Sequence, residues 1–208
     1  MTCRCWLALI LLSLPCPCLQ ADERALTLQE QLVRESSTDL ARAARQKGDA
    51  ARGAVLFFQP FLTCAKCHDA DTGTQLGPDL AKIGKEGTPE YLIESVLFPS
   101  KVIKKGYETA IITTTDGRTY TGLVAEEKAG KLTLIDPAAG GKRIVIANAE
   151  IEQRQTSKQS LMPEGLVNLL SDRQQFLDLA KYLMEIAEHG ATRARELRPA
   201  QPTVVIAE

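Results

Sequence analysis

The sequence predicts an α+β protein that is mainly helical, with a small antiparallel β module inserted between two helical parts. Helical patterns with capping and stop signals occur before residue 106 and return after Pro163. Between about 106 and 156 the chain is rich in Thr, Ile, Val and Tyr and is punctuated by glycine turns. The 208 residues, 44% hydrophobic and 25% charged, suffice for one ordinary domain or two small ones.

Residues 1–21 have the composition of an export signal. Arg4 supplies a positive charge, residues 6–14 form an apolar run, and the segment ends in a small residue, Ala21. The run is short for a bilayer span. We therefore expect a periplasmic or secreted protein with no membrane span after signal cleavage; an uncleaved anchor is the alternative.

The cysteines divide between this signal and a single close pair. Cys64 and Cys67 lie beyond the signal, and one close pair does not make a disulfide framework. A lipoprotein signal that ends at Cys16 or Cys18 is disfavoured, because prolines precede both residues. The cysteines inside residues 1–21 are Cys3, Cys5, Cys16 and Cys18.

Three helices are expected before residue 100. Residues 22–47 are expected to form a helical extension, because their apolar positions are sparse. A glycine-rich loop is expected over 69–87. The helices are one over 38–47 that Gly48 ends, one that Asp49 caps and Pro60 stops, and one that opens at Thr88-Pro89 and stops at Pro99.

The β-prone segment predicts a meander or a small barrel. Asp116-Gly117 between two β-prone runs is a strong hairpin signal. After Pro163, apolar positions from Phe176 to Ile186 fit one face of a closing helix that His189-Gly190 ends, and 191–208 are expected to be a flexible tail. The five strands are expected at about 107–115, 118–125, 131–136, 142–147 and 150–155.

Cys64-Ala65-Lys66-Cys67-His68 is a CxxCH motif, whose spacing is typical of covalent haem attachment. Two thiols can add to the two vinyl groups on one edge of a porphyrin, and the adjacent imidazole can bind the iron. The motif predicts one haem c per chain, attached through Cys64 and Cys67, with His68 as an iron ligand.

Three other interpretations of the motif stay open. A redox-active CxxC usually follows a strand, whereas a helix is expected here. A zinc site needs further ligands, and His189 is the only other histidine in the chain. A structural disulfide would leave His68 without a role.

The order of motifs resembles that of class I cytochromes c. It consists of a helix with Gly53 and Phe57, CxxCH, Gly77-Pro78-Asp79-Leu80, a late Met-Pro, and a closing helix with Tyr182-Leu183. More narrowly, the segments GPDLAKIG, YLIESVLFPSKVIKKGYE, TTDGRTYTGLV and LMPEGL are similar to the planctomycete-type haem-binding domain family. The resemblance implies a cytochrome c haem domain over 48–106 and 157–190, interrupted by a β module over 107–156.

The resemblance also assigns individual roles. It implies that the Pro78 carbonyl accepts a hydrogen bond from His68 Nδ1, and that Met162 is the second iron ligand. Met184 is the competing methionine, but it falls within the closing helix, and His189 is a poorer candidate at a helix end.

The resemblance further implies that Gly53 and Phe57 pack against the closing helix near Tyr182. These three residues would belong to the core and would bind no ligand.

The favoured function is single-electron transfer between redox proteins, such as a periplasmic dehydrogenase and a terminal acceptor, without enzymatic chemistry. The alternatives are a haem enzyme or gas sensor with an open iron position, and a binding module with a structural haem. The net charge of −1 gives no argument for a nucleic-acid partner. The β module is expected either to shield the haem edge or to dock a partner, and Lys101, Lys104 and Lys105 precede it.

Overall fold

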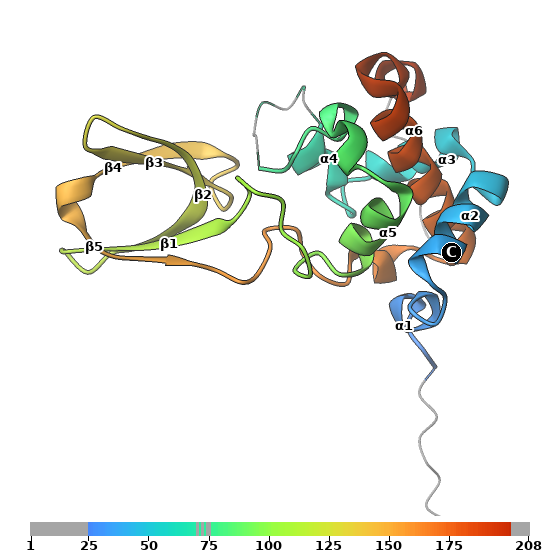
Figure 1. The fold of residues 1–208 in the computed structure, drawn as a ribbon, viewed down its shortest axis with the longest axis horizontal. Helices are drawn as coiled ribbons and strands as arrows, with labels where there is room; N and C mark the ends of the chain where they lie inside the picture. The colour runs from blue at the N-terminus through green and yellow to red at the C-terminus, as the bar shows by residue number, and fades with distance from the viewer. Residues whose placement is uncertain (1–24, 70, 72, 74–75, 201–208) are drawn as a thin grey trace, which may run out of the picture.

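The computed structural model describes residues 25–69, 71, 73 and 76–200, so the predicted export signal and residues 201–208 lie outside the described part. Helices gather at one end of the molecule and a five-stranded antiparallel sheet forms the other end (Figure 1). This arrangement confirms the α+β prediction. The helices are α1 (Leu28–Leu32), α2 (Ser37–Lys47), α3 (Ala50–Phe57), α4 (Cys64–His68), α5 (Pro89–Leu97) and α6 (Arg173–Leu197), with short 3-10 turns η2 (Leu80–Lys82), η3 (Gly84–Glu86), η4 (Asn148–Glu150) and η5 (Leu166–Leu169).

Capping residues set several of these helices as predicted. The Asp49 carboxylate accepts from the Ala51 and Arg52 N–H groups at the start of α3. Thr88 caps α5 and Pro89 occupies its first turn. At α6 the cap is Asp172, whose carboxylate accepts from the Gln175 N–H.

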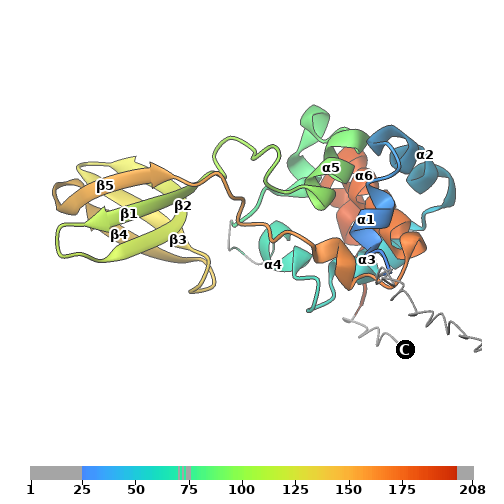
Figure 2. The same cartoon turned by 90° about the horizontal axis from the view of Figure 1, so that it is seen from below.

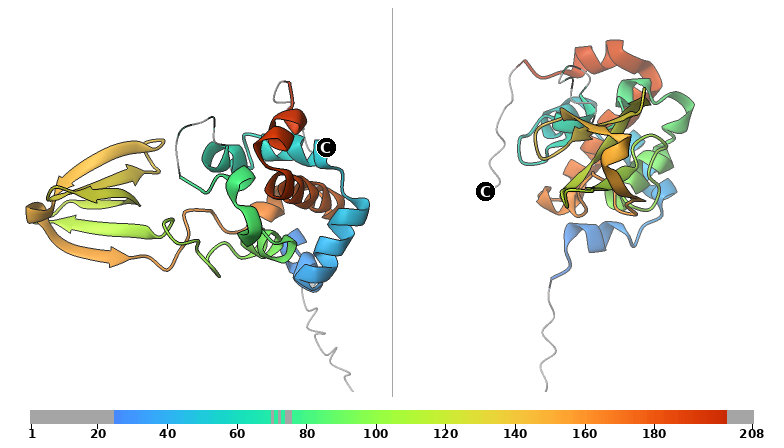
Figure 3. Two further views of the ribbon diagram at one scale, coloured as in Figure 1. Left: turned by 45° about the horizontal axis from the view of Figure 1, so that its top comes forward. Right: turned by 90° about the vertical axis from the view of Figure 1, so that its left-hand side faces the viewer.

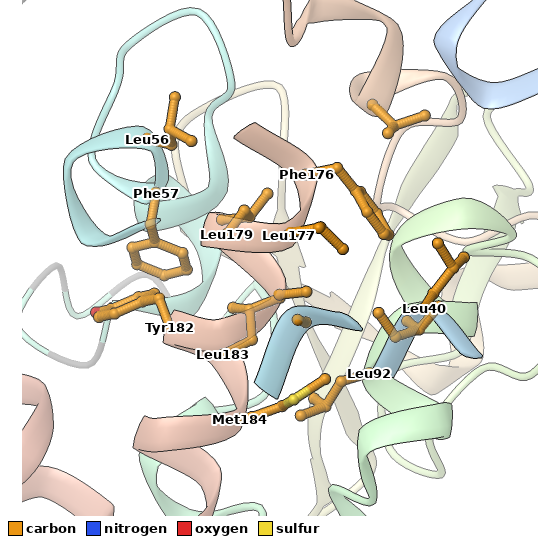
Figure 4. Packing of buried hydrophobic residues seen from close by; sticks show 14 of the residues in the cluster. Leu40, Leu56, Phe57, Leu92, Phe176, Leu177, Leu179, Tyr182, Leu183 and Met184 are labelled. Carbon is orange, nitrogen blue, oxygen red and sulfur yellow. The ribbon is translucent and has the colours of Figure 1, made fainter. Parts of the chain in front are cut away.

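The helical core is built on the close contact between α3 and α6. A Cβ atom on Gly53 would lie 2.0 Å from the Asp178 carbonyl oxygen, so only glycine permits this approach. The Phe57 and Tyr182 rings lie beside each other with centroids 5.1 Å apart (Figure 4). The predicted packing of Gly53 and Phe57 near Tyr182 is therefore confirmed.

A buried carboxylate ties the same two helices together. Asp178 is 3% exposed and accepts hydrogen bonds from the Asp49 N–H at 2.8 Å, Arg52 Nε at 2.7 Å and Gln174 Nε2 at 2.8 Å. Burial opposes ionisation of Asp178, but these hydrogen bonds outweigh it and hold its pKa below the usual value. Asp178 therefore joins the N-terminus of α3 to α6 as a carboxylate.

The predicted helical extension over 22–47 contributes to the core, although its apolar positions are sparse. Leu32 of α1 and Leu40 and Ala44 of α2 are buried in the same apolar cluster as the closing helix. Apolar positions are sparse in this segment, but they fall on one side, and α2 packs against both α5 and α6. A few well-placed residues are therefore enough to make these helices part of the core.

The closing helix also continues further than predicted. His189 is followed by a kink at Gly190, whose φ of 74° lies in the left-handed region, and the chain then resumes a helix through Leu197. Arg198 Nη2 binds Asp69 Oδ2 at 2.6 Å, and its guanidinium lies over the Phe58 ring. The expectation of a flexible tail is thus wrong for residues 191–198.

The sheet has the order β4-β3-β2-β1-β5, so four strands form a meander and β5 returns beside β1. The sheet curls over on itself (Figure 3). Its strands carry a separate apolar cluster, which includes Ile112, Leu134 and Ile146. All five predicted strands are present: β3 and β4 have the predicted bounds, and β1, β2 and β5 have shifted ends. Their bounds are β1 (Thr109–Thr114), β2 (Thr119–Lys128), β3 (Lys131–Asp136), β4 (Lys142–Ala147) and β5 (Ile151–Thr156).

Two connections join the sheet to the helices, and they run beside each other (Figure 2). The Ser157 N–H donates to the Thr109 carbonyl at 2.8 Å, and the Ser160 N–H donates to Ser100 Oγ at 3.3 Å. The chain therefore leaves and rejoins the helical part at neighbouring points, as an inserted module requires.

Candidate functional site

The CxxCH motif lies on α4, a short helix between the α3 end and a loop. Thr63 precedes it with φ 57°, a left-handed conformation that is uncommon for a β-branched residue. Cys64 and Cys67 are free thiols, with no disulfide between them. Burial raises the pKa of Cys64 to about 12 and raises the pKa of Cys67 as well. A redox-active CxxC pair shows the opposite shift, because its attacking cysteine is stabilised as a thiolate.

The His68 ring is held in one orientation by a hydrogen bond. His68 Nδ1 lies 2.9 Å from the Pro78 carbonyl oxygen, which can only accept. Nδ1 therefore carries the hydrogen, and Nε2 of the neutral ring keeps its lone pair for a metal. Burial lowers the pKa of His68, while the bond to Pro78 opposes this shift. The contact between His68 and Pro78 is the one that the sequence resemblance implied.

Gly77 leaves room for this ring. A Cβ atom at position 77 would lie 2.7 Å from His68 Cε1 and 2.9 Å from Nδ1, well inside van der Waals contact. The Gly77 N–H also donates to the Cys67 carbonyl at 3.1 Å, which returns the loop to the motif. Position 77 therefore has to be glycine, because any side chain there would clash with the His68 ring.

Gly77→Ala is expected to push the His68 ring away from Pro78 and to cost about 1–3 kcal/mol of stability. If the haem that the CxxCH motif predicts is bound, Gly77→Ala should convert part of a low-spin spectrum to high-spin. Gly84→Ala is the control, because nothing lies within 4 Å of a Cβ there, although its φ of 59° also strains the backbone. An unchanged spectrum in Gly77→Ala would contradict the steric role of Gly77.

His68 and Met162 face one continuous apolar space, although they are 94 positions apart in the chain. An outer cavity of about 880 Å³, including its open mouth, is lined by Cys64, Cys67, His68 and Met162. A deeper cavity of about 580 Å³, also including its open mouth, shares Cys64, His68 and Met162 with it. The predicted site residues Cys64, Cys67, His68, Pro78 and Met162 all line the outer cavity.

The loop before η5 brings Met162 to this space. The Met162 N–H donates to Ser160 Oγ at 3.1 Å, and the same serine is joined to Ser100. Met162 is partly buried and lies outside any helix. Met184, in contrast, is 2% exposed and lies beside Leu92 in the helical core (Figure 4). Of the two methionines in the described residues, Met162 is the one that lines the cavity.

His189 lies away from this cavity. Its side chain is 59% exposed near the α6 kink, with Glu185 4.0 Å away. A zinc site would need at least three nearby ligands, and among the described residues no group of three or more His, Cys, Asp or Glu side chains is placed to hold a metal.

The sheet contributes directly to the wall around Cys67. Leu123 of β2 and Ile135 of β3 form a buried cluster with Leu76, against which Cys67 and Tyr107 pack. Leu123 and Ile135 are directly paired across the two strands, so both side chains point to the same face. The sequence left open whether the β module shields the site or docks a partner protein. This contact favours the first role, because the sheet covers the site on the side of Cys67.

Arg198 is a residue that sequence reasoning missed. It binds Asp69, the residue after His68, and also reaches Asp71 at 2.9 Å. Arg198 lines a further cavity together with His68, Tyr182 and Phe58, so the C-terminal end of α6 also borders His68. An arginine in a charged terminal segment carries no sequence signal for such a contact.

No family model matches the chain, and a search of curated proteins finds no significant similarity. Within the described residues, no helix has the length and apolar character needed to cross a membrane.

Proposed function

We propose that the chain is an exported mono-haem c-type cytochrome that carries single electrons between redox proteins. The haem is attached through Cys64 and Cys67, and the iron is bound by His68 and Met162. The fold proposed for the helical part is the class I cytochrome c fold, with the sheet as an insertion. The observation that carries the proposal is the convergence of CxxCH, the His68–Pro78 bond and Met162 on one apolar cavity.

The residues fit this group in three respects. Both thiols of the motif reach the same cavity. The hydrogen bond to Pro78 leaves His68 Nε2 as the free imidazole nitrogen, and Met162 supplies a thioether from a separate loop. The surrounding wall is apolar, which supports a cofactor that is largely removed from water.

When bound, the haem supplies a reversible one-electron change at its iron. The chain's own residues adjust that change. A thioether ligand favours the ferrous state, and the hydrogen bond from His68 Nδ1 to the Pro78 carbonyl increases the basicity of the imidazole. The apolar wall disfavours the more highly charged state of the iron site. These effects act in opposite directions, so the potential depends on ligand, hydrogen bond and burial together.

The test replaces both Cys64 and Cys67 with alanine and expresses the protein in a host that matures c-type cytochromes. Haem staining on a denaturing gel is expected in the wild type and absent in the double variant. Cys64→Ala and Cys67→Ala alone should each leave a weaker, single attachment. Full staining in the double variant, or no staining of the wild type, would overturn the proposal.

A further inference from the structure

The outer cavity has one charged corner, formed by Lys104 between two tyrosines. Tyr91 in the first turn of α5, Lys104 and Tyr107 all line the outer cavity and are not among the residues that line the deeper one. Apart from His68, Lys104 is the only basic side chain among the described residues that line either cavity. The rest of the wall is dominated by apolar side chains, so this corner is chemically distinct.

A tight turn fixes the corner. The Tyr107 N–H donates to the Lys104 carbonyl at 2.9 Å, and Gly106 within the turn has φ 89°. A φ in that range at the third position of a turn is adopted readily by glycine. The turn places Lys104 and Tyr107 together, and the Tyr107 ring packs against the cluster of Leu123 and Ile135 from the sheet. The corner therefore depends on both the helical part and the sheet.

Lys104 is held partly out of water. Its side chain is 27% exposed and pairs with Glu86 of η3, whose own side chain is 71% exposed. Ion pairs with such an exposed partner contribute little to stability. Glu86 can therefore return to water at small cost, which leaves the ammonium group available to another anion inside the cavity.

The proposed cofactor needs such a group. A haem carries two propionate carboxylates on the edge opposite its two vinyl groups. The thiols of Cys64 and Cys67 fix the vinyl edge, so the carboxylates point away from the motif. A carboxylate beside apolar walls requires a cation or strong hydrogen-bond donors.

We propose that Lys104, with the phenol group of Tyr91, forms the carboxylate subsite of this cavity and binds a haem propionate. The subsite rests on the proposed function and extends it to residues for which sequence reasoning gave no role. Glu86 is the partner that the propionate displaces. Lys104 is thereby a positioning residue that orients the cofactor edge and places a positive charge near it.

The test uses haem-loaded full-length protein and compares Lys104→Gln with Lys105→Gln. The two variants lose the same charge one position apart, and Lys105 is exposed and does not line the cavity. Lys104→Gln is expected to lower the reduction potential, because loss of a nearby positive charge favours ferric iron. It should also shift the propionate bending mode in resonance Raman spectra. Lys105→Gln should leave that mode in place and change the potential much less.

Two charge-conserving variants keep the test decisive if Lys104→Gln fails to mature. Lys104→Arg should retain most of the wild-type potential, and Tyr91→Phe should shift the propionate mode without any change in charge. Equal shifts in Lys104→Gln and Lys105→Gln, or unshifted modes in both Lys104→Gln and Tyr91→Phe, would overturn the subsite. Wild-type protein without covalent haem would instead overturn the proposed function itself.

Discussion

Met162→Ala is expected to remove the weak near-infrared band of methionine-ligated ferric haem while leaving the haem covalently attached. The reduction potential should fall, because the thioether that favours ferrous iron is gone. The protein should remain folded, since Met162 lies in a loop and is only partly buried. Spectroscopy and potentiometric titration of the purified variant measure both effects.

Met184→Ala is the matched comparison, and it should lower stability without removing the near-infrared band. Met184 is buried at 2% exposure in the helical core, so its truncation is expected to cost about 2–5 kcal/mol of unfolding free energy. The near-infrared band should persist. A Met162→Ala protein that keeps the band would exclude Met162 as a ligand. A wild-type protein that lacks the band would favour an open iron position, as in a haem enzyme or gas sensor.

Asp178→Ala is expected to destabilise the helical part by about 2–4 kcal/mol. The variant loses charge-assisted hydrogen bonds, each worth about 1.5–3 kcal/mol, and leaves the Asp49 N–H and the Gln174 amide without this acceptor. The ion pair itself adds little, because the Arg52 side chain is 59% exposed. Denaturant unfolding should show the loss, whereas Glu196→Ala, at an exposed pair on the same helix, should change stability by less than about 0.5 kcal/mol.

The effect of Asp178 should also depend on pH. Its pKa is lower in the folded protein than in the unfolded chain, so its contribution is complete above the unfolded value of about 3.9. The contribution is lost as the pH falls through the lower, folded value. The stability difference between wild type and Asp178→Ala should therefore be constant near neutral pH and shrink below about pH 4. A difference that grows in acid would contradict the assigned charge state.

Local signals in the sequence predicted much of the fold. Capping by Asp49 and Thr88, the Asp116-Gly117 hairpin and the alternation of β-prone runs depend on neighbouring residues, and the structure agrees with them. The close packing of Gly53 on the closing helix was predicted from the resemblance to cytochromes c. The structure agrees, because a side chain at position 53 would collide with α6.

The errors concern contacts between distant segments. The apolar positions of residues 22–47 are sparse, and the core that buries Leu32 and Leu40 is completed by α5 and α6, which no local pattern reveals. The segment after Gly190 was predicted to be a flexible tail, but it forms a helix. The contact that holds it, between Arg198 and Asp69, joins residues 129 positions apart and leaves no local signal in the sequence. The position of Lys104 in the cavity wall was also not predicted. Clusters of lysines before a strand usually only face solvent, so the sequence assigns Lys104 no specific role.

The contact between the sheet and the site changes how the inserted module is understood. Leu123 and Ile135 pack into the cluster that borders Cys67, so the module is inserted in sequence but forms part of the wall in space. Excision of the module is therefore expected to leave the His68–Pro78 contact in place and to expose the Cys67 side to water.

The intact mass of the purified protein, measured after denaturation, tests the central proposal most directly. Expression in a host that attaches haem to CxxCH motifs should give a chain heavier by one haem, and the added mass should map to the peptide with Cys64 and Cys67. A pyridine haemochrome spectrum of the same sample should show two thioether links. A denatured chain with the unmodified mass, from a host that matures a control cytochrome correctly, would contradict the account.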